Sequence, residues 1–388
     1  MESTESDKGA VLRLAVVQFV FTLGWTVYVV FLPALLARAG LPANWLPWLL
    51  IIDQAIFAIM DIAFGLIADR IGQAWQRLAR TILWLTTLSA LAFLALPVVS
   101  GVAPAAMLAV TLLWVVTASV VRAPTVVLLA KQARAAQQAS LVSWYSGGMA
   151  LAMALSPFFG MWLKGSDPLL PFAVSAAVLW LAVVALLRWQ QPLPASDEST
   201  QPPLPFASYR PLLAGLLLAA FGLQLHAFVN AGPLFGKLAE PARLPWLLPW
   251  LWVGFAAAMP LVGALCKRFG ALWLAGSGML ATAAMIWAAP AVNAENSLIL
   301  LQLVAGFGWG LGFAGLMSFA SAAGSRGAEG LFMGSFFAMT AVAAVARILL
   351  ASQWLPALGD SRYTLPAVCL FIAACSTLWL ARRLPDRH

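Results

Sequence analysis

The sequence predicts an all-α membrane protein of twelve transmembrane helices, and three observations lead to this fold class. Of the 388 residues, 63% are apolar and only 9% are charged, and the mean hydropathy is +0.91. Soluble domains carry about 25% charged residues, so this chain lacks the polar groups to cover a surface in water. Its apolar residues form continuous runs, whereas strands of a membrane β-barrel alternate with a period of two. A bilayer core about 30 Å thick needs roughly 20 residues per helix, which predicts about a dozen spans.

Six expected spans precede a polar segment of the chain, and six follow it. They are placed at residues 13–38, 46–68, 81–100, 105–130, 139–163 and 169–188, and then at 211–233, 246–266, 272–291, 297–323, 330–351 and 365–381. The opening MESTESDKGA is acidic and lacks the basic region of a cleavable secretory signal. The first span is therefore expected to remain in the mature protein.

The distribution of basic residues predicts the orientation. Of the 22 Lys and Arg residues, fifteen fall on the side that holds both termini, five fall on the other side, and two lie inside expected spans. Because Lys and Arg accumulate in cytoplasmic loops, both termini are expected in the cytoplasm, with the protein in the inner membrane. The net charge of +8 is then a signal of topology and gives no reason to expect nucleic-acid binding.

The polar segment at residues 189–210 divides the chain into two halves. It is rich in Pro, Ser and acidic residues, and it is expected to be a cytoplasmic linker between six-helix bundles at residues 1–188 and 211–388. The halves repeat at an offset of 198 residues: GLIADRIG after the second span matches GALCKRFG after the eighth. The same offset places Tyr28 on His226. Such a duplication is typical of transporters whose halves rock about a central site.

The segment GLIADRIG resembles the signature loop of the major facilitator superfamily, GxxxDRxGRR. The matching positions are Gly65, Asp69, Arg70 and Gly72. The resemblance implies that Asp69 engages the start of the eleventh span when the cytoplasmic side is closed. In the fifth span, ALAMALSPFFG is partly similar to a glycine-rich motif of exporters in this superfamily, because Pro157 and Gly160 have the same spacing. Export is therefore slightly favoured over uptake.

Five ionisable residues lie inside expected spans, where each costs at least about 2.5 to 3.5 kcal/mol on insertion scales: Asp53, Asp61, Arg122, His226 and Arg347. Asp61 and Arg122 should share a depth roughly 12 to 14 Å from the cytoplasmic helix ends. We expect them to pair near the middle of the membrane, where a proton or the substrate would compete for one partner. A permanent structural ion pair is the alternative.

Asp53 and Arg347 are matched in depth as well, roughly 24 to 27 Å from the cytoplasmic ends. The second and eleventh spans face each other in the superfamily, so these two residues are expected to form a periplasmic latch that closes in the inward-open state. The alternative is that each side chain extends to the nearby interface.

The first and seventh spans line the central cavity in the superfamily, and they supply further candidates for substrate binding. Tyr28 and His226 are expected to face the substrate from opposite halves, and a histidine exchanges protons near physiological pH. Polar packing between helices is the alternative for His226. The remaining candidates are Trp25, Gln224, Asn230 and Trp309, the two tryptophans as surfaces on which a substrate could stack.

These observations predict a proton-coupled secondary transporter that moves a small organic molecule by alternating access and acts as a monomer. The alternatives are a proton symporter or facilitator for an organic anion, since Arg122 and Arg347 could hold a carboxylate, and a lipid flippase. An enzyme is not expected, because no HExxH or GxSxG motif occurs. The three cysteines show no CxxC spacing, so neither a metal nor another cofactor is expected.

Overall fold

A computed structural model describes residues 2–71, 75–122, 125, 135–188, 204–324 and 327–384, and within these residues the chain forms helices and no strands. The first half contains α1 (Glu2–Arg38), α2 (Trp45–Ile71), α3 (Trp75–Val99), α4 (Pro104–Ala118), the 3-10 turn η1 (Ser119–Val121), α6 (Ala135–Trp162) and α7 (Leu169–Arg188). The long helices among these are rich in apolar residues, as helices that cross a bilayer must be.

The second half contains the same kind of helices with more interruptions. They are α8 (Phe206–Leu225), the π-helical turn η2 (His226–Asn230), α9 (Ala231–Gly236), η3 (Pro241–Arg243), α10 (Leu244–Leu247), α11 (Trp250–Phe269), α12 (Ala271–Ala288), η4 (Ala289–Ala291), α13 (Glu295–Ala323), α14 (Glu329–Leu349), the π-helical turn η5 (Leu350–Trp354), α15 (Leu355–Leu358) and α16 (Ser361–Ala381). The two π-helical turns interrupt the seventh and eleventh expected spans.

Eleven stretches of the described chain are helical, long and apolar enough to cross a membrane. They correspond to eleven of the expected spans. The remaining expected span, residues 139–163, coincides with α6, which is 28 residues long but is not among the eleven. The chain is therefore a multi-pass membrane protein.

The expected fourth span, residues 105–130, is wrong as an uninterrupted helix. The α-helix ends at Ala118, the 3-10 turn follows, and Arg122 has a non-helical backbone with φ −84° and ψ −95°. Pro124 follows two residues later in the sequence and has no N–H for the carbonyl four residues before it. Residues 123–124 and 126–130 of this span lie outside the described residues.

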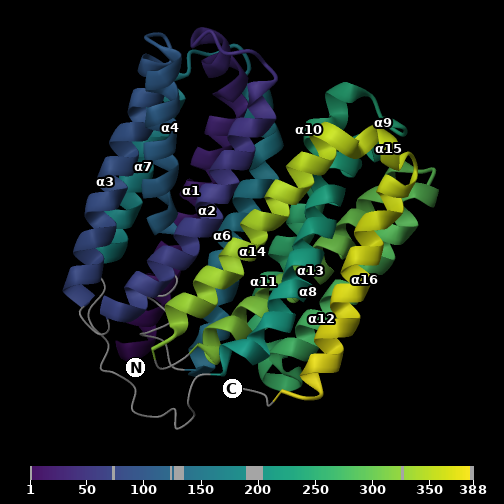
Figure 1. The fold of residues 1–388 in the computed structure, drawn as a ribbon. Coiled ribbons are helices and arrows are strands. Elements are labelled where there is room, and N and C mark those ends of the chain that lie inside the picture. The colour runs from purple at the N-terminus through teal and green to yellow at the C-terminus, as the bar shows by residue number, and fades with distance from the viewer. Residues whose placement is uncertain are drawn as a thin grey trace.

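The helices of the two halves pack in corresponding ways, and Figure 1 shows the halves side by side. In the first half α7 contacts α1 and α3, and in the second half α16 contacts α8 and α12. Contacts between the halves include α6 with α13, and the most extensive are α2 with α14 and α6 with α11. The last two correspond to each other at the offset of the sequence repeat, as do the contacts named within each half, so the duplication seen in the sequence extends to the packing.

Both chain termini lie at one end of the molecule, which we call the terminal end; we call the opposite end the far end (Figure 1). One hydrophobic core covers the terminal end of the first half and much of the second half. At the far end the first half has its own core around Phe31, Trp114 and Phe172, and the second half has another around Phe235 and Tyr363. The two halves therefore share one core at the terminal end, whereas at the far end each half has a core of its own, with Ala341 of α14 packed into that of the first half.

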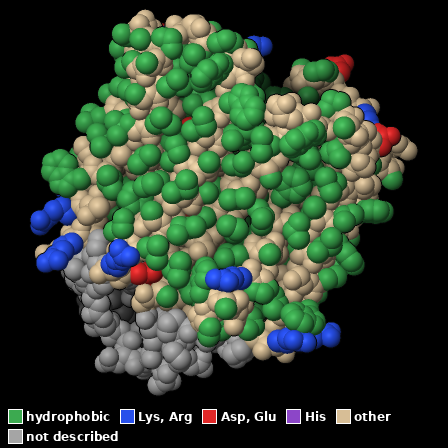
Figure 2. All heavy atoms as spheres, in the orientation of Figure 1, with side chains coloured by type: hydrophobic (Ala, Val, Ile, Leu, Met, Phe, Trp, Pro, Cys, Tyr) green, Lys and Arg blue, Asp and Glu red, His purple; other side chains and the backbone are tan. Residues whose placement is uncertain are grey.

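Glycines permit the closest contact between the halves, where α2 meets α14. A Cβ atom on Gly65 would collide with the carbonyl oxygen of Gly330, and one on Gly330 would collide with the carbonyl of Gly65. Figure 2 shows one face of the molecule, with hydrophobic side chains across the middle and most of the visible Lys and Arg along the lower edge. Charge and packing thus both distinguish the terminal end from the far end.

Candidate functional site

Asp61 and Arg122 form an ion pair in the interior of the protein. Arg122 Nη2 lies 3.2 Å from Asp61 Oδ2; the Asp61 side chain is fully buried and that of Arg122 is 14% exposed. Asp61 comes from the middle of α2, and Arg122 follows the η1 turn at which α4 ends. The pairing predicted from their common depth is confirmed, while its role in transport stays a prediction.

The pair lies at the boundary between the two halves. The Arg122 guanidinium carbon is 4.7 Å from the centroid of the Phe57 ring on α2 and 5.7 Å from that of Phe337 on α14. Cation–π contacts of this kind are worth about 2 kcal/mol when they are desolvated. On the same side of α2, a Cβ atom on Gly334 of α14 would collide with the carbonyl oxygen of Asp61. The charged pair is therefore held directly against a helix of the other half.

The hydrogen bonding around this pair is incomplete. Neither carboxylate oxygen of Asp61 has a hydrogen-bond partner, and neither does the buried hydroxyl of Tyr145 on α6. Tyr145 interacts electrostatically with both Asp61 and Arg122, and its ring contacts Phe337 at 5.8 Å between centroids. Buried polar atoms are almost always hydrogen-bonded, so this cluster has capacity for a proton or a polar ligand. Sequence reasoning missed Tyr145; its signal was a tyrosine inside a span in a chain with only four.

Asp69 closes the terminal end of the molecule. Its carboxylate accepts hydrogen bonds from the backbone N–H groups of Gly330 (2.7 Å) and Leu331 (2.8 Å), in the first turn of α14. A helix N-terminus has free N–H groups and a positive dipole end, which both favour a carboxylate. The contact between Asp69 and the eleventh span is confirmed. Arg70 is exposed at the end of α2, and Gly72 lies outside the described residues.

Asp53 contacts Tyr28, and the expected pair with Arg347 is not formed in this structure. The Tyr28 hydroxyl donates a hydrogen bond of 2.8 Å to Asp53 Oδ2, and both side chains are fully buried. Their common depth did not determine which way each side chain points around its helix. The latch expected between Asp53 and Arg347 therefore stays a prediction.

Tyr28 and His226 are both buried and hydrogen-bonded within their own halves in this structure, and their expected contact with the substrate stays a prediction. His226 is 1% exposed, and its Nε2 lies 3.1 Å from Oε1 of Gln302 on α13, with donor and acceptor set by the tautomer. Tyr28 is equally buried, inside the first half. Each residue therefore links two helices of its own half, and Gln302 is a partner that sequence reasoning missed.

Gln224 and Asn230 also link helices of the second half. Gln224 Nε2 donates a hydrogen bond of 3.1 Å to the carbonyl oxygen of Thr340 on α14. Asn230 Nδ2 donates one of 2.7 Å to the carbonyl of Arg362 on α16. Gln224 remains partly exposed, whereas Asn230 is buried. Of these two substrate candidates, only Gln224 has surface left for a ligand in this conformation.

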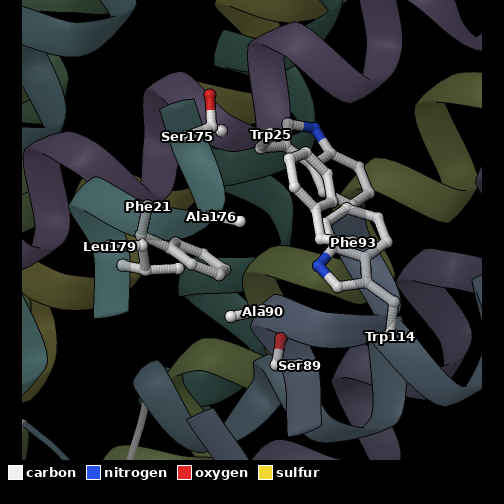
Figure 3. Close-up of a pocket in the computed structure, with 10 residues that line it drawn as sticks. Phe21, Trp25, Ser89, Ala90, Phe93, Trp114, Ser175, Ala176 and Leu179 are labelled. Atoms are coloured by element: carbon white, nitrogen blue, oxygen red, sulfur yellow. The ribbon is translucent and has the colours of Figure 1, made fainter. Parts of the chain in front are cut away.

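The two candidate tryptophans have different environments. Trp309 is 4% exposed and packs on Phe313, so it belongs to the core of the second half. Trp25 packs on Trp114 at 5.7 Å between ring centroids and lines a small apolar pocket inside the first half. Figure 3 shows Trp25, Phe93 and Trp114 grouped on one side of this pocket. Trp25 thus lies inside the first half, whereas Trp309 lies on α13, which contacts α6 of the first half. The expected stacking of a substrate on either ring stays a prediction.

Arg347 has no ion-pair partner among the described residues. Its guanidinium carbon lies 4.8 Å from the centroid of the Phe228 ring, and its buried Nε has no hydrogen-bond partner. The other arginines with a carboxylate within 4.0 Å include Arg122, paired with Asp61, and Arg243, paired with Glu295. No group of three His, Cys, Asp or Glu side chains that could hold a metal occurs in these residues.

Comparisons with known proteins identify the family. The family model described as Major Facilitator Superfamily matches residues 14–348. A search of curated proteins gave no match. Among solved structures, the human organic anion transporter MFSD10 (TETRAN) superposes with a TM-score of 0.77 at 15% identity, covering 96% of this chain and 99% of that one.

Two structures of FucP show the same fold. FucP in the outward conformation gives a TM-score of 0.69 at 14% identity and covers 97% of this chain and 99% of its own. A single-substitution variant of the E. coli fucose:proton symporter FucP gives 0.71 at 12% identity, covering 95% and 98%. At such identities the likeness concerns the fold, and the family model carries the assignment. The chain belongs to the Major Facilitator Superfamily and is a secondary transporter.

Proposed function

We propose that this protein is a proton-coupled secondary active transporter that moves a small organic molecule by alternating access, with Asp61 and Arg122 as the coupling pair. In this proposal twelve spans form two bundles, residues 1–188 and 211–388, joined by a cytoplasmic linker at 189–210. The terminal end is then the cytoplasmic side of an inner membrane, and the structure is a conformation closed on that side.

The observation that carries the proposal is the incomplete hydrogen bonding of a buried ion pair at the boundary between the halves. Protonation of Asp61 removes the negative charge that holds Arg122. A buried guanidinium without a counter-charge is costly, so it then needs another partner or a move toward water. A proton and a polar group of the substrate thus compete for the same pair, which is the differential affinity that coupling requires.

The pair is also connected to the contact of α2 with α14 that closes the terminal end. Asp61 and Asp69 are two turns apart on α2, and both touch α14: Asp61 through its carbonyl at Gly334, and Asp69 through Gly330 and Leu331. Arg122 touches α14 through Phe337. A change in the charge of the pair therefore acts on the same helix contact that closes the terminal end.

Export is the direction that we propose, on the partial exporter motif of the fifth span. A second candidate is transport of an organic anion, which two observations favour. Arg347 has a buried Nε and no counter-charge in the described residues, and the similar fold of MFSD10 belongs to an organic anion transporter.

The proposal is tested with purified protein in proteoliposomes. Accumulation of labelled anionic, cationic and zwitterionic compounds is measured with no pH gradient and with gradients of either sign. We expect one class of compound to accumulate against its gradient only when a pH gradient is imposed, and collapse of that gradient by a protonophore to abolish accumulation. Equal uptake under all conditions would contradict proton coupling and leave a facilitator.

A further inference from the structure

We propose that Arg347, Phe228 and Trp252 form the binding site for an amphipathic aromatic anion, with Arg347 holding its charged group. The inference rests on the proposed transport function and names the class of its substrate. It assigns to Arg347 a role in binding, in addition to the latch expected from its depth.

The position of these residues places them on the side of the second half that faces the first half. Arg347 lies at the end of α14, and Trp252 lies on α11. Both helices contact the first half, because α14 packs on α2 and α11 packs on α6. Phe228 contacts both residues, with its ring 4.8 Å from the Arg347 guanidinium carbon and 6.1 Å from the Trp252 ring. The Phe228 ring therefore lies between Arg347 of α14 and Trp252 of α11.

These three residues lie toward the far end of the molecule. Arg347 is 17 residues beyond Gly330, where α2 and α14 meet at the terminal end. Seventeen residues of helix correspond to about 25 Å along the axis. A ligand that arrives from the far end would therefore meet Arg347 well before the contact of Gly65 with Gly330.

The charge of Arg347 lacks compensation from the described protein. Arginine stays protonated in proteins, and within the described residues no carboxylate lies within 4.0 Å of it. Asp53, the acid at matching depth, accepts its hydrogen bond from Tyr28 instead. The Phe228 ring compensates only part of the cost of a guanidinium at this depth. A carboxylate or sulfonate would supply the opposite charge and can accept two parallel hydrogen bonds from the guanidinium.

The aromatic neighbours determine what the anion should carry. Phe228 is 48% exposed, and Trp252 is partly exposed. An aromatic group next to the anion would cover these rings and gain the burial of apolar area that the rings now lack. In addition, Phe228 lies in the π-helical turn η2, and Arg347 lies just before the turn η5. Such turns are frequent at functional sites.

Arg122 is less suited than Arg347 to bind an anion, because the two guanidinium groups have different neighbours. Arg122 already faces Asp61 at 3.2 Å, so an incoming anion would have to displace a carboxylate. Arg347 faces only a ring. An anion therefore binds Arg347 without breaking an existing ion pair.

The test is a binding measurement on the purified full-length protein, with three probes of one shape: 2-naphthalenesulfonate, 2-naphthalenemethanol and 2-naphthylmethylammonium. Thermal unfolding is followed at increasing probe concentration. We expect the sulfonate to raise Tm in a saturable manner, the alcohol to raise it less, and the ammonium compound to have no saturable effect. Arg347→Gln should weaken sulfonate binding by about tenfold or more, since an ion-paired hydrogen bond is lost.

Matched variants separate the site from general effects. Arg347→Lys keeps the charge and should retain part of the affinity, and Phe228→Ala should weaken binding several-fold. Arg38→Gln removes an exposed arginine at the same end and should leave binding unchanged. Should Arg347→Gln fail to fold, the comparison of Arg347→Lys with Phe228→Ala takes its place.

Two results would overturn the proposal: equal sulfonate affinity in wild type and Arg347→Gln, or no saturable stabilisation of the wild type by the sulfonate. The measurement uses no membrane and no gradient. Sulfonate binding without any effect of a pH gradient on transport would therefore contradict proton coupling and leave the anion site standing, and the reverse combination would contradict the anion site alone.

Discussion

The two halves of the molecule share a packing scheme but carry different chemistry. At the offset of the repeat, Tyr28 of the first half corresponds to His226 of the second, and Asp69 corresponds to Lys267. The ion pair of Asp61 with Arg122 lies in the first half, while the acidic residues of the second half lie in loops or near helix ends. The two halves therefore share their helix contacts but differ in the charged residues that they carry inside the membrane. We accordingly propose that the proton binds in the first half and that the charge of the substrate is recognised in the second.

The two corresponding contacts between the halves, α2 with α14 and α11 with α6, also differ in chemistry. The contact of α2 with α14 has a carboxylate on two backbone N–H groups and a pair of glycines in backbone contact. In the corresponding contact of α11 with α6, Gly147 faces the Met259 side chain at an ordinary distance of 3.6 Å from its added Cβ. One contact is polar and tight, and the other is apolar and looser, so breaking the first should have the larger effect.

The largest effect is expected from Gly65→Ala. Its Cβ would collide with the carbonyl oxygen of Gly330, so α2 and α14 must separate, at a cost of about 1 to 3 kcal/mol. Transport should fall at least about tenfold, and Tm should fall in the purified protein. The repeat-related Gly263→Ala is the matched control, because a Cβ there meets nothing within 4 Å and alanine favours helix. Equal effects of the two substitutions would break the comparison between the halves.

A smaller effect is expected from Asp69→Asn, which keeps one acceptor oxygen but removes the charge at the start of α14. Hydrogen exchange of the Gly330 and Leu331 amides should become about tenfold faster, as loss of a charge-assisted hydrogen bond predicts. Lys267→Gln, at the corresponding position of the second half, should leave these amides unchanged. Unchanged exchange in Asp69→Asn would show that the glycine contact alone closes the terminal end.

The smallest effect is expected from Tyr28→Phe, measured as stability. The change removes the hydrogen bond that the Asp53 carboxyl group accepts and should cost about 1 kcal/mol, seen as a slightly lower Tm. Tyr145→Phe is the matched control for stability, because the Tyr145 hydroxyl has no hydrogen-bond partner to lose. A larger loss in Tyr145→Phe than in Tyr28→Phe would show that the Tyr145 hydroxyl is bonded in the membrane.

Sequence reasoning predicted the helices and one of the two charge pairs, and the reason lies in helix geometry. Depth follows from the rise per residue, so Asp61 and Arg122 could be matched from their distance to the helix ends. Direction around the helix is set by packing with other helices, and depth contains no information about it. Asp53 therefore bonds Tyr28 and not Arg347.

The residues that sequence reasoning missed are neutral partners. Gln302 faces His226, and Tyr145 lies beside Asp61 and Arg122. A neutral polar side chain inside a span costs less than a charge, so it gives a weaker signal of function in the sequence. Such partners become visible only when the helices are packed together.

We propose that Asp61 binds the coupling proton. The most direct test compares Asp61→Asn with wild type in one proteoliposome preparation. Exchange of labelled for unlabelled substrate and accumulation driven by a pH gradient are both measured, with Asp360→Asn, a change in a far-end loop, as control. We predict that Asp61→Asn retains exchange but loses gradient-driven accumulation, while Asp360→Asn keeps both. Gradient-driven accumulation at the wild-type level in Asp61→Asn would contradict the account.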